Sequence, residues 1–531
     1  MSVKNYQLPL LTIVAGVLFT LYLHSQIPDG VYFSGDAGLK ALLAQQLSTE
    51  VRFDLIPPEE TWIRTLWNEG LYPYAEPFVY HVANRYYITF PFTFPLLTAP
   101  FYALFGYRGL YVVPLIALWA TWLVFYWMCR RLQLRGVYAA IALVSLIFAS
   151  PLTLYSAMYW EHTLAVGLCL AGLALLLTDL TRLSIWRAVS SGVLIGLSVW
   201  FRPEFLCLAA LLTLGFYVIP LLDKIGLRKS SLAQYRVDHR TLLVASLFVT
   251  IGLFFIFNKI IYGYALGIHS IQIVEEVSLL QKLKDAWNNF RGLSWAYFEF
   301  FPIASYSILY VFYGFFSKKF KITFEVVAAY LFWLLFTIGV SIIVPVGTAG
   351  LIAGGKQWGP RFLLILVPIV SLLTVVELAS IVGKLRRTKK YFSTGLISVL
   401  LVIGVYQNTI LGTKYLQKNY QEVVPVLRFL QQNNDKIVAV SHQFVAQVLE
   451  ASIAEKLFLT VDDKQDLAKL SIALAAREKQ QFVYICYPFR PCPLPQEISD
   501  NFEENRHIGT RFIFLGELGK YSVYKGSLIE K

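Results

Sequence analysis

The sequence predicts an all-α polytopic membrane protein of about eleven transmembrane helices, with a small C-terminal α/β domain. Of its 531 residues, 57% are hydrophobic and only 15% are charged, which is typical of multi-span membrane proteins. Lys and Arg gather in alternate connections between the apolar segments. From about residue 412 the pattern changes to short alternating strands and helices. These three observations predict the fold class.

Eleven apolar segments are candidate transmembrane helices, because about 20 apolar residues span a membrane core about 30 Å thick. They are residues 8–23, 109–129, 137–155, 163–178, 188–201, 205–221, 241–262, 295–316, 326–345, 361–382 and 393–411. No small-residue cleavage site follows the first segment, so we interpret it as an anchor.

The basic residues predict the orientation. Eighteen Lys and Arg lie in 53 residues of connecting sequence, whereas the long connection 25–108 holds five basic and eight acidic residues. The positive-inside rule then places the N-terminus in the cytoplasm, and the loop 25–108 and the tail outside the inner membrane. The net charge of +13 therefore reports topology and contact with membrane lipids, and excludes nucleic acid as a partner. The basic connections are 130–136, 179–187, 222–240, 317–325 and 383–391.

Residues 91–106 are apolar but are not expected to cross the membrane. Pro91, Pro95 and Pro100 disfavour a straight helix, and an extra span would put the basic cluster of 130–136 outside. We predict a helix lying at the outer interface.

The apolar segment 188–201 is only about 20 Å long as a helix, and it ends at Arg202-Pro203-Glu204. This turn should lie below the outer membrane surface, where charged groups need protein or a wet cavity around them. An open cavity and a structural Arg–Glu pair are the two interpretations.

The remaining connections and the tail complete the organisation. A helix is expected within 263–294, and a flexible Gly-rich loop over 346–360. We assign residues 1–411 to the transmembrane domain and 412–531 to an extracytoplasmic α/β domain. In that domain Cys486 and Cys492 could pair in an oxidising compartment, whereas Cys129, Cys169 and Cys207 are expected to be buried and inert.

Two carboxylates stand near the predicted external face. Asp36 follows the first span and could act as a general base, although capping of the next helix is the alternative. Glu161 lies between the third and fourth spans, where an interfacial structural role is the alternative. A metal site would also need His81, His162 or His269, and their spacing indicates no ligand set.

Three basic side chains could bind a phosphate at the outer headgroup level. Lys356 and Arg361 lie in GGKQWGPRFLL, and Arg202 could join Arg361 in a bidentate clamp. An Arg at a membrane edge is otherwise a snorkelling anchor.

In combination, these motifs resemble the GT-C superfamily of integral membrane glycosyltransferases. The resemblance covers about residues 8–411 and is nearest the protein-mannosyltransferase-like and aminoarabinose-transferase-like branch. It rests on Asp36 after the first span, the Pro-rich aromatic helix, Glu161, the turn at Arg202-Pro203-Glu204 and WGPRFLL. Where the family has Asp-Pro this chain has Glu161-His162, and its interfacial loop has Phe90-Pro91-Phe92, so the acceptor contacts are not assigned.

The resemblance implies transfer of a hexosyl or pentosyl group, with inversion, from a polyprenyl-phosphate-linked donor to a lipid, glycan or protein acceptor. It implies catalytic roles for Asp36 and Glu161, and phosphate binding by Arg202, Arg361 and Lys356. Candidate contacts to the acceptor or to a metal ion are His81, His162, Glu204 and His269. No cofactor is certain, and a divalent metal ion stays open because the family has members with and without one.

Two other classes of protein are also compatible with a chain that crosses the membrane several times. A transporter or lipid flippase usually brings repeats and ionisable groups at mid-membrane, which this sequence lacks apart from residues near the span ends. A polysaccharide polymerase or ligase would be expected to carry a late loop rich in Arg and His.

Overall fold

The computed structural model describes residues 4–177, 184–224, 237–268, 270–271, 278–316, 324–344, 357–384, 387–494, 502–503 and 506–530. Contacts divide the chain into two compact units. The first unit is Met1–Ser25, Tyr111–Ala265 and Val274–Lys414, and the second is Gln26–Leu110, Leu266–Ile273 and Tyr415–Lys531. The long loop after the first span and the C-terminal tail therefore belong to one unit.

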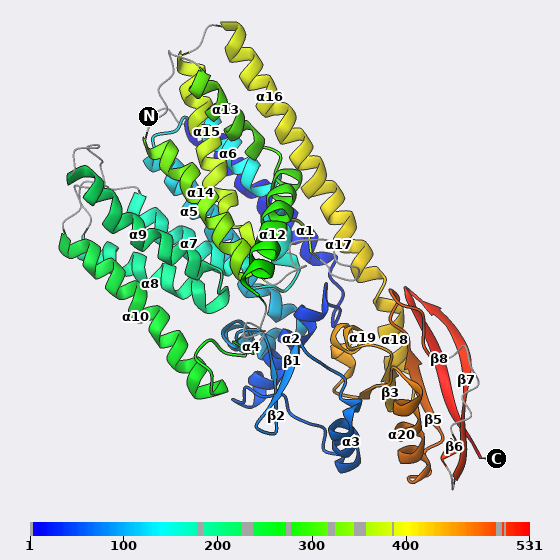
Figure 1. Ribbon diagram of the computed structural model, residues 1–531. Helices are drawn as coiled ribbons and strands as arrows, with labels where there is room; N and C mark the ends of the chain where they lie inside the picture. The colour runs from blue at the N-terminus through cyan, green and yellow to red at the C-terminus, as the bar shows by residue number, and fades with distance from the viewer. Residues whose placement is uncertain are drawn as a thin grey trace. The chain divides into compact units, whose positions relative to one another are not determined.

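The first unit is helical (Figure 1). Its helices are α1 (Lys4–Ser25), α5 (Val112–Arg131), α6 (Gly136–Ile147), α7 (His162–Leu177), α8 (Ile185–Phe201), α9 (Phe205–Lys224), α10 (Val237–Tyr262), α12 (Leu279–Phe300), α13 (Ala304–Phe316), α14 (Phe324–Ile343), α15 (Leu366–Lys384) and α16 (Arg387–Val405). The most extensive helix packing described in this unit is at α8, which contacts both α7 and α10. A methyl group on Gly192 would lie 2.3 Å from the carbonyl oxygen of Leu243, so a small residue is needed for this close helix contact.

These helices confirm a multi-pass membrane protein. Within the described ranges, five helices are long and apolar enough to span a membrane, or six if the bent pair Gly136–Ile147 and Pro151–Ala157 is one span. Shorter apolar helices occupy four more of the expected spans: His162–Leu176, Ile185–Phe201, Phe205–Val218 and Leu366–Val382. The number eleven stays a prediction, as does the orientation.

Several expected spans differ from the structure. The segment 137–155 is the bent pair, and 109–129 is part of the longer helical run Thr93–Arg131. The segment 295–316 is divided, because α12 ends at Phe300 and α13 begins at Ala304. Pro302 lies in the break and cannot donate the hydrogen bond that a continuous helix needs. The span expected over 393–411 is part of a longer helical run, Lys390–Gln432. The loop 346–360 lies outside the described residues up to residue 356.

The first part of the second unit is the loop that follows α1. It contains α2 (Gly35–Thr49), α3 (Thr61–Leu66), the antiparallel strands β1 (Val79–Val82) and β2 (Arg85–Ile88), and α4 (Thr93–Phe105). Helix α4 confirms the helix expected over 91–106, and it packs against α2. Its place at the membrane interface stays a prediction.

The tail forms the α/β domain that the sequence predicts. Its sheet has the order β4-β3-β5-β8-β7-β6, parallel at β4, β3 and β5 and antiparallel at the long β7–β8 hairpin (Figure 1). Cys486 and Cys492 form a disulfide. The elements are α17 (Gly412–Gln421), α18 (Val424–Gln432), β3 (Ile437–Val440), α19 (Gln443–Val448), β4 (Leu457–Thr460), α20 (Lys464–Ala475), β5 (Gln481–Ile485), β6 (Phe502–Glu503), β7 (Arg506–Leu518) and β8 (Tyr521–Glu530).

The tail shares its core with the loop. Ile63, Leu66 and Leu71 of the loop are buried in one cluster with residues of β3, β4, α20 and β5. The Trp67 Nε1 donates to the carbonyl oxygen of Phe458 on β4 at 3.3 Å. Apolar burial of this kind is the main stabilising term in folding, so the loop and the tail stabilise each other.

Candidate active site

Arg202 lies in the turn that ends α8, where the sequence places it, and it contacts two carboxylates. Its Nη1 is 3.0 Å from Glu161 Oε1, and its Nε is 2.8 Å from Glu204 Oε1. The Arg202 side chain is 11% exposed and that of Glu161 only 2%. Pro203 cannot continue the helix, so the chain turns and returns as α9. The turn therefore gathers one guanidinium and two carboxylates away from water.

A second guanidinium lies beside this cluster. Arg361 packs over the rings of Trp160 and Phe362, 5.3 and 5.0 Å from their centroids. Arg202 lies 5.1 Å from the same Phe362 ring. Aromatic faces attract guanidinium groups through the ring quadrupole. The two arginines thus share one aromatic platform, and with the two carboxylates their formal charges sum to zero.

His162 lines the same narrow crevice. It begins α7, is 97% buried, and lies against Tyr155 and Trp160, with ring centroids 5.0 and 5.2 Å away. The crevice lining is His162, Val166, Arg202, Glu204, Phe205, Arg361, Phe362, Leu364 and Ile365. The structure thus brings together Glu161, His162, Arg202, Glu204 and Arg361, which are all candidate site residues of the sequence.

A hydrogen-bonded network holds the chain before Arg361. Tyr155 Oη donates to the carbonyl oxygen of Trp358 at 3.0 Å, and Trp358 Nε1 donates to Asn408 Oδ1 at 3.1 Å. The amide of Asn408 in turn donates to the carbonyl oxygens of Phe300 and Gly404. Gly359 has φ +75°, and a methyl group there would lie 3.0 Å from the Phe300 Cβ, so the turn requires glycine.

We predict that Asn408→Ala destabilises the first unit by about 1–3 kcal/mol, because it removes the bond from the partly buried Trp358 indole N–H and those to the carbonyl oxygens of Phe300 and Gly404. Thermal unfolding in detergent, followed by tryptophan fluorescence, measures the change. Asn288→Ala, at an exposed position of α12, is the control and should leave the transition unchanged. Equal transitions for the two variants would contradict a structural role for Asn408.

Asp36 belongs to the second unit, in the first turn of α2. Ser34 occupies the N-cap position, so the alternative interpretation, in which Asp36 caps this helix, is wrong. A carboxylate in the first turn is still stabilised by the helix dipole. Asp36 is partly buried, and so its carboxylate is not a fully solvated surface group.

Lys40, one turn after Asp36, was not identified as a site residue from the sequence. It is 2% exposed, and its Nζ lies 4.5 Å from the centroid of the Phe90 ring. Residues at i and i+4 share one helix face. The spacing Asp-x-x-x-Lys at a helix start, followed by apolar positions, was the signal that could have found it.

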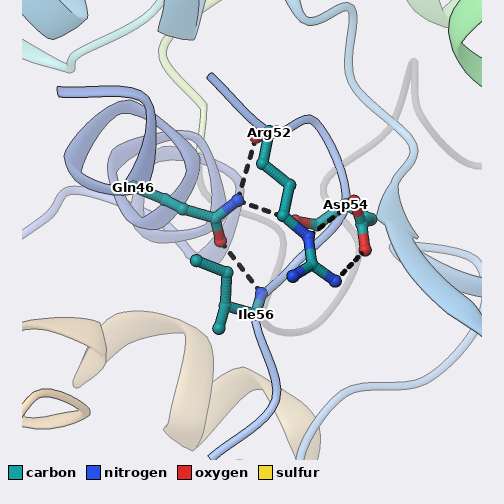
Figure 2. Close-up of polar contacts among 4 residues, drawn as sticks. All are labelled: Gln46, Arg52, Asp54 and Ile56. Carbon is teal, nitrogen blue, oxygen red and sulfur yellow. Dashed lines mark hydrogen bonds and ion pairs between the residues drawn. The ribbon is translucent and has the colours of Figure 1, made fainter. Parts of the chain in front are cut away.

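The far end of α2 is tied to the chain that follows it. Figure 2 shows Gln46 Nε2 donating to the carbonyl oxygens of Arg52 and Asp54, at 2.9 and 2.7 Å, while Gln46 Oε1 accepts from the Ile56 N–H at 2.9 Å. Arg52 and Asp54 form an ion pair in the same turn. One side chain therefore satisfies three backbone groups and fixes the exit from the helix.

The other residues proposed for acceptor or metal binding are not gathered into a site. His81 lies exposed on β1, stacked on Tyr86 with 4.6 Å between ring centroids. Lys356 and His269 lie outside the described residues. Among the described residues, the group of carboxylates with metal-like spacing is Asp462, Asp463 and Asp466. That group contains none of the predicted site residues.

Glu450 is a buried carboxyl packed against α2. It is 1% exposed, and Gln45 Nε2 donates to its Oε2 at 3.2 Å. Burial raises its pKa from 4.5 to about 8, although hydrogen bonds from Tyr32 and Gln45 lower it. The folded protein therefore binds this proton more tightly than the unfolded chain does.

The raised pKa of Glu450 predicts a pH-dependent stability. Between pH 4.5 and about 8 the folded state keeps a proton that the unfolded chain loses, so stability is fully present below pH 4.5 and falls as the pH rises. We expect the melting temperature of the second unit to fall by about 5 °C or more from pH 5 to pH 9, and less in Glu450→Gln. Glu455→Gln, at an exposed position, should behave as wild type. A melting temperature that rises over this range in wild type relative to Glu450→Gln would contradict the prediction.

The comparisons with known proteins concern the fold. No family model and no curated protein matches the chain. The solved structure of ArnT from Cupriavidus metallidurans bound to undecaprenyl phosphate is similar over 97% of both chains, with TM-score 0.50 and 11% identity. Its apo state gives TM-score 0.49 at 12% identity over the same shares. The oligosaccharyltransferase AglB from Archaeoglobus fulgidus, in complex with an inhibitory peptide and a dolichol-phosphate, gives TM-score 0.47 at 13% identity over 91% of this chain and 69% of that one.

ArnT is an aminoarabinose transferase of the GT-C superfamily. The likeness to it extends over nearly the whole of both chains, including the tail. The predicted fold class is therefore confirmed: the chain has the fold of the GT-C membrane glycosyltransferase ArnT.

Proposed function

We propose that this chain is a glycosyltransferase that moves a sugar from a polyprenyl-phosphate-linked donor to an acceptor hydroxyl on the extracytoplasmic face of the inner membrane. The observation that carries the proposal is the crevice on this fold. It is lined by two partly buried guanidinium groups, a buried histidine and the buried Glu204, and the buried Glu161 pairs with Arg202 beside it. Charges are costly in such surroundings and are typical of functional sites. The solved ArnT structure binds undecaprenyl phosphate, and a lipid phosphate is a ligand that guanidinium groups recognise.

The donor phosphate is assigned to Arg361 and Arg202. Their shared position on Phe362 allows both to donate to one phosphate, and planar forked donors match its oxygens. Arg202 is already held by Glu161 and Glu204. We therefore assign it the orientation of the phosphate, and assign most of the phosphate-binding free energy to Arg361. Lys356 is assigned a further contact with the same phosphate.

Asp36 is assigned the role of general base. It takes the proton of the acceptor hydroxyl while that oxygen attacks the anomeric carbon, and the bond from this carbon to the phosphate oxygen breaks with its electron pair leaving on the phosphate. Phosphate is a good leaving group, so this departure requires positive charge and no general acid. In-line displacement inverts the anomeric centre. Glu161 positions Arg202, and the acceptor is a hydroxyl of a lipid, glycan or protein.

The test is to reconstitute the purified chain in liposomes with a panel of polyprenyl-phosphate sugars and a mixture of lipid, glycan and peptide acceptors. We expect product from at least one hexosyl or pentosyl donor, together with release of polyprenyl phosphate. A parallel arm with EDTA decides whether a divalent metal ion is needed. Movement of solute or lipid across the membrane, with no product from any donor, would replace this proposal by the transporter or flippase alternative.

A further inference from the structure

The helix that carries Asp36 packs tightly against the tail. A methyl group on Gly35 would lie 2.1 Å from Gln447 Oε1, and one on Gly38 would lie 1.8 Å from the Gln447 main-chain oxygen. Real side-chain carbons do not approach other atoms so closely, so α19 can only lie here because both positions are glycine. These two glycines flank Asp36 in the sequence.

The contact continues along the same face of α2. Gln45, seven residues after Gly38, donates to Glu450 at 3.2 Å. Seven residues are two helical turns, so Gly38 and Gln45 face the same partner. Glu450 is 1% exposed and Gln447 is fully buried. The segment 447–450 therefore contacts α2 directly from its first turn to its third.

The same short helix also holds the loop farther along. Gln443 Oε1 accepts from the Ala75 N–H at 2.9 Å, Gln443 Nε2 donates to the Glu76 carbonyl oxygen at 3.3 Å, and Gln447 Nε2 donates to Gln443 Oε1 at 3.1 Å. These bonds fix the side chain that rests on Gly35. Gln447 is thus positioned by its own element and by the loop that it contacts.

We propose that the tail positions Asp36: the segment 443–450 is a platform for α2, and Gln447 is the positioning residue that sets the first turn. The proposal rests on the role of Asp36 in the proposed function. In this proposal the tail contributes to catalysis by positioning α2, and not by binding a ligand of its own. Because a displacement of about 1 Å in a reacting group can lower a rate about 100-fold, a methyl group in this contact should affect turnover.

The decisive variant is Gly38→Ala in the full chain in liposomes. Its methyl group meets a main-chain oxygen that cannot rotate away, so α2 must move. We expect kcat to fall by about 10-fold or more, with the donor KM changed less than about threefold, because the phosphate contacts lie in the other unit. Gly509→Ala is the control, since a methyl group there would have 3.9 Å to its nearest atom and should leave kcat unchanged.

Gly35→Ala tests the side chain of Gln447. Its methyl group meets the flexible end of Gln447, so we expect a smaller loss of kcat than in Gly38→Ala. We also expect a loss of kcat in Gln447→Ala, which removes the side chain that rests on Gly35. Normal turnover in Gly38→Ala or in Gln447→Ala would overturn the proposal.

Hydrogen exchange of the amides of residues 35–41 separates this proposal from the proposed function. We expect faster exchange in Gly38→Ala than in wild type or Gly509→Ala. If wild type transfers no sugar, the proposed function fails, and exchange alone decides whether the tail holds α2. Unchanged exchange in Gly38→Ala would overturn the platform even if turnover fell.

Discussion

Asn in place of Asp36 is expected to lower kcat for sugar transfer by about 10²- to 10⁴-fold, the usual contribution of a general base. Asn keeps the size and polarity of the side chain but cannot accept the hydroxyl proton. The donor KM should change little, because the phosphate is assigned to other residues. Steady-state transfer by the reconstituted variant measures both parameters.

Asp29→Asn is the matched control for Asp36→Asn. Asp29 lies in the same loop, is 65% exposed and pairs with Arg108 at the surface, where an ion pair contributes little. It should keep wild-type turnover. Asp36→Glu should retain more activity than Asp36→Asn, because it keeps the basic group at a changed distance. Undiminished transfer by Asp36→Asn would remove this residue from the mechanism.

Arg202→Met is expected to destabilise the first unit by about 3–5 kcal/mol, because it removes the guanidinium that neutralises the buried carboxylates of Glu161 and Glu204. Arg187→Met, at a partly exposed position near the start of the same helix, should cost much less. Thermal unfolding in detergent compares the two. A small effect of Arg202→Met would show that water enters the turn and solvates the carboxylates.

A triple variant separates the structural role of this cluster from its chemical role. Arg202→Met together with Glu161→Gln and Glu204→Gln removes all three charges, and replacing a whole buried ion cluster is often neutral or stabilising. Folding should therefore recover. If the cluster only holds the turn, transfer recovers with folding. Under the proposed function the triple variant folds and stays inactive, since the donor phosphate loses Arg202 and its positioning carboxylate.

Local signals in the sequence were enough to predict most of the helices and strands. The hydrophobic segment before Arg202-Pro203 predicted both the short helix α8 and its turn, because proline lacks the backbone N–H that a continuing helix would use and disfavours its continuation. The alternation from IVAV at β3 to the β7–β8 hairpin predicted the tail for a similar reason: each strand or helix has its own periodicity. The same reasoning failed at Pro302, where an apolar run concealed the break between α12 and α13.

Contacts between distant residues needed the structure. The sequence left two interpretations for Arg202 and Glu204, an open cavity and a structural ion pair. In the structure Arg202 pairs with Glu204 and also with Glu161, 41 residues away. The packing of Arg202 beside Arg361 on one Phe362 ring has no signature in spacing, because Arg202 follows α8 whereas Arg361 and Phe362 precede α15.

For this protein, then, the sequence by itself determined the fold class, the helices and strands of the tail, and the list of charged residues from which a site could be built. Periodicity, proline and charge act over a few neighbouring residues, and so they can be read along the chain. Only the tertiary structure decided that Arg202 lies between two carboxylates, and that Gly35 and Gly38 lie against Gln447 more than 400 residues later. Such contacts depend on how whole helices pack, and packing is decided by the shape of every side chain in the interface at once.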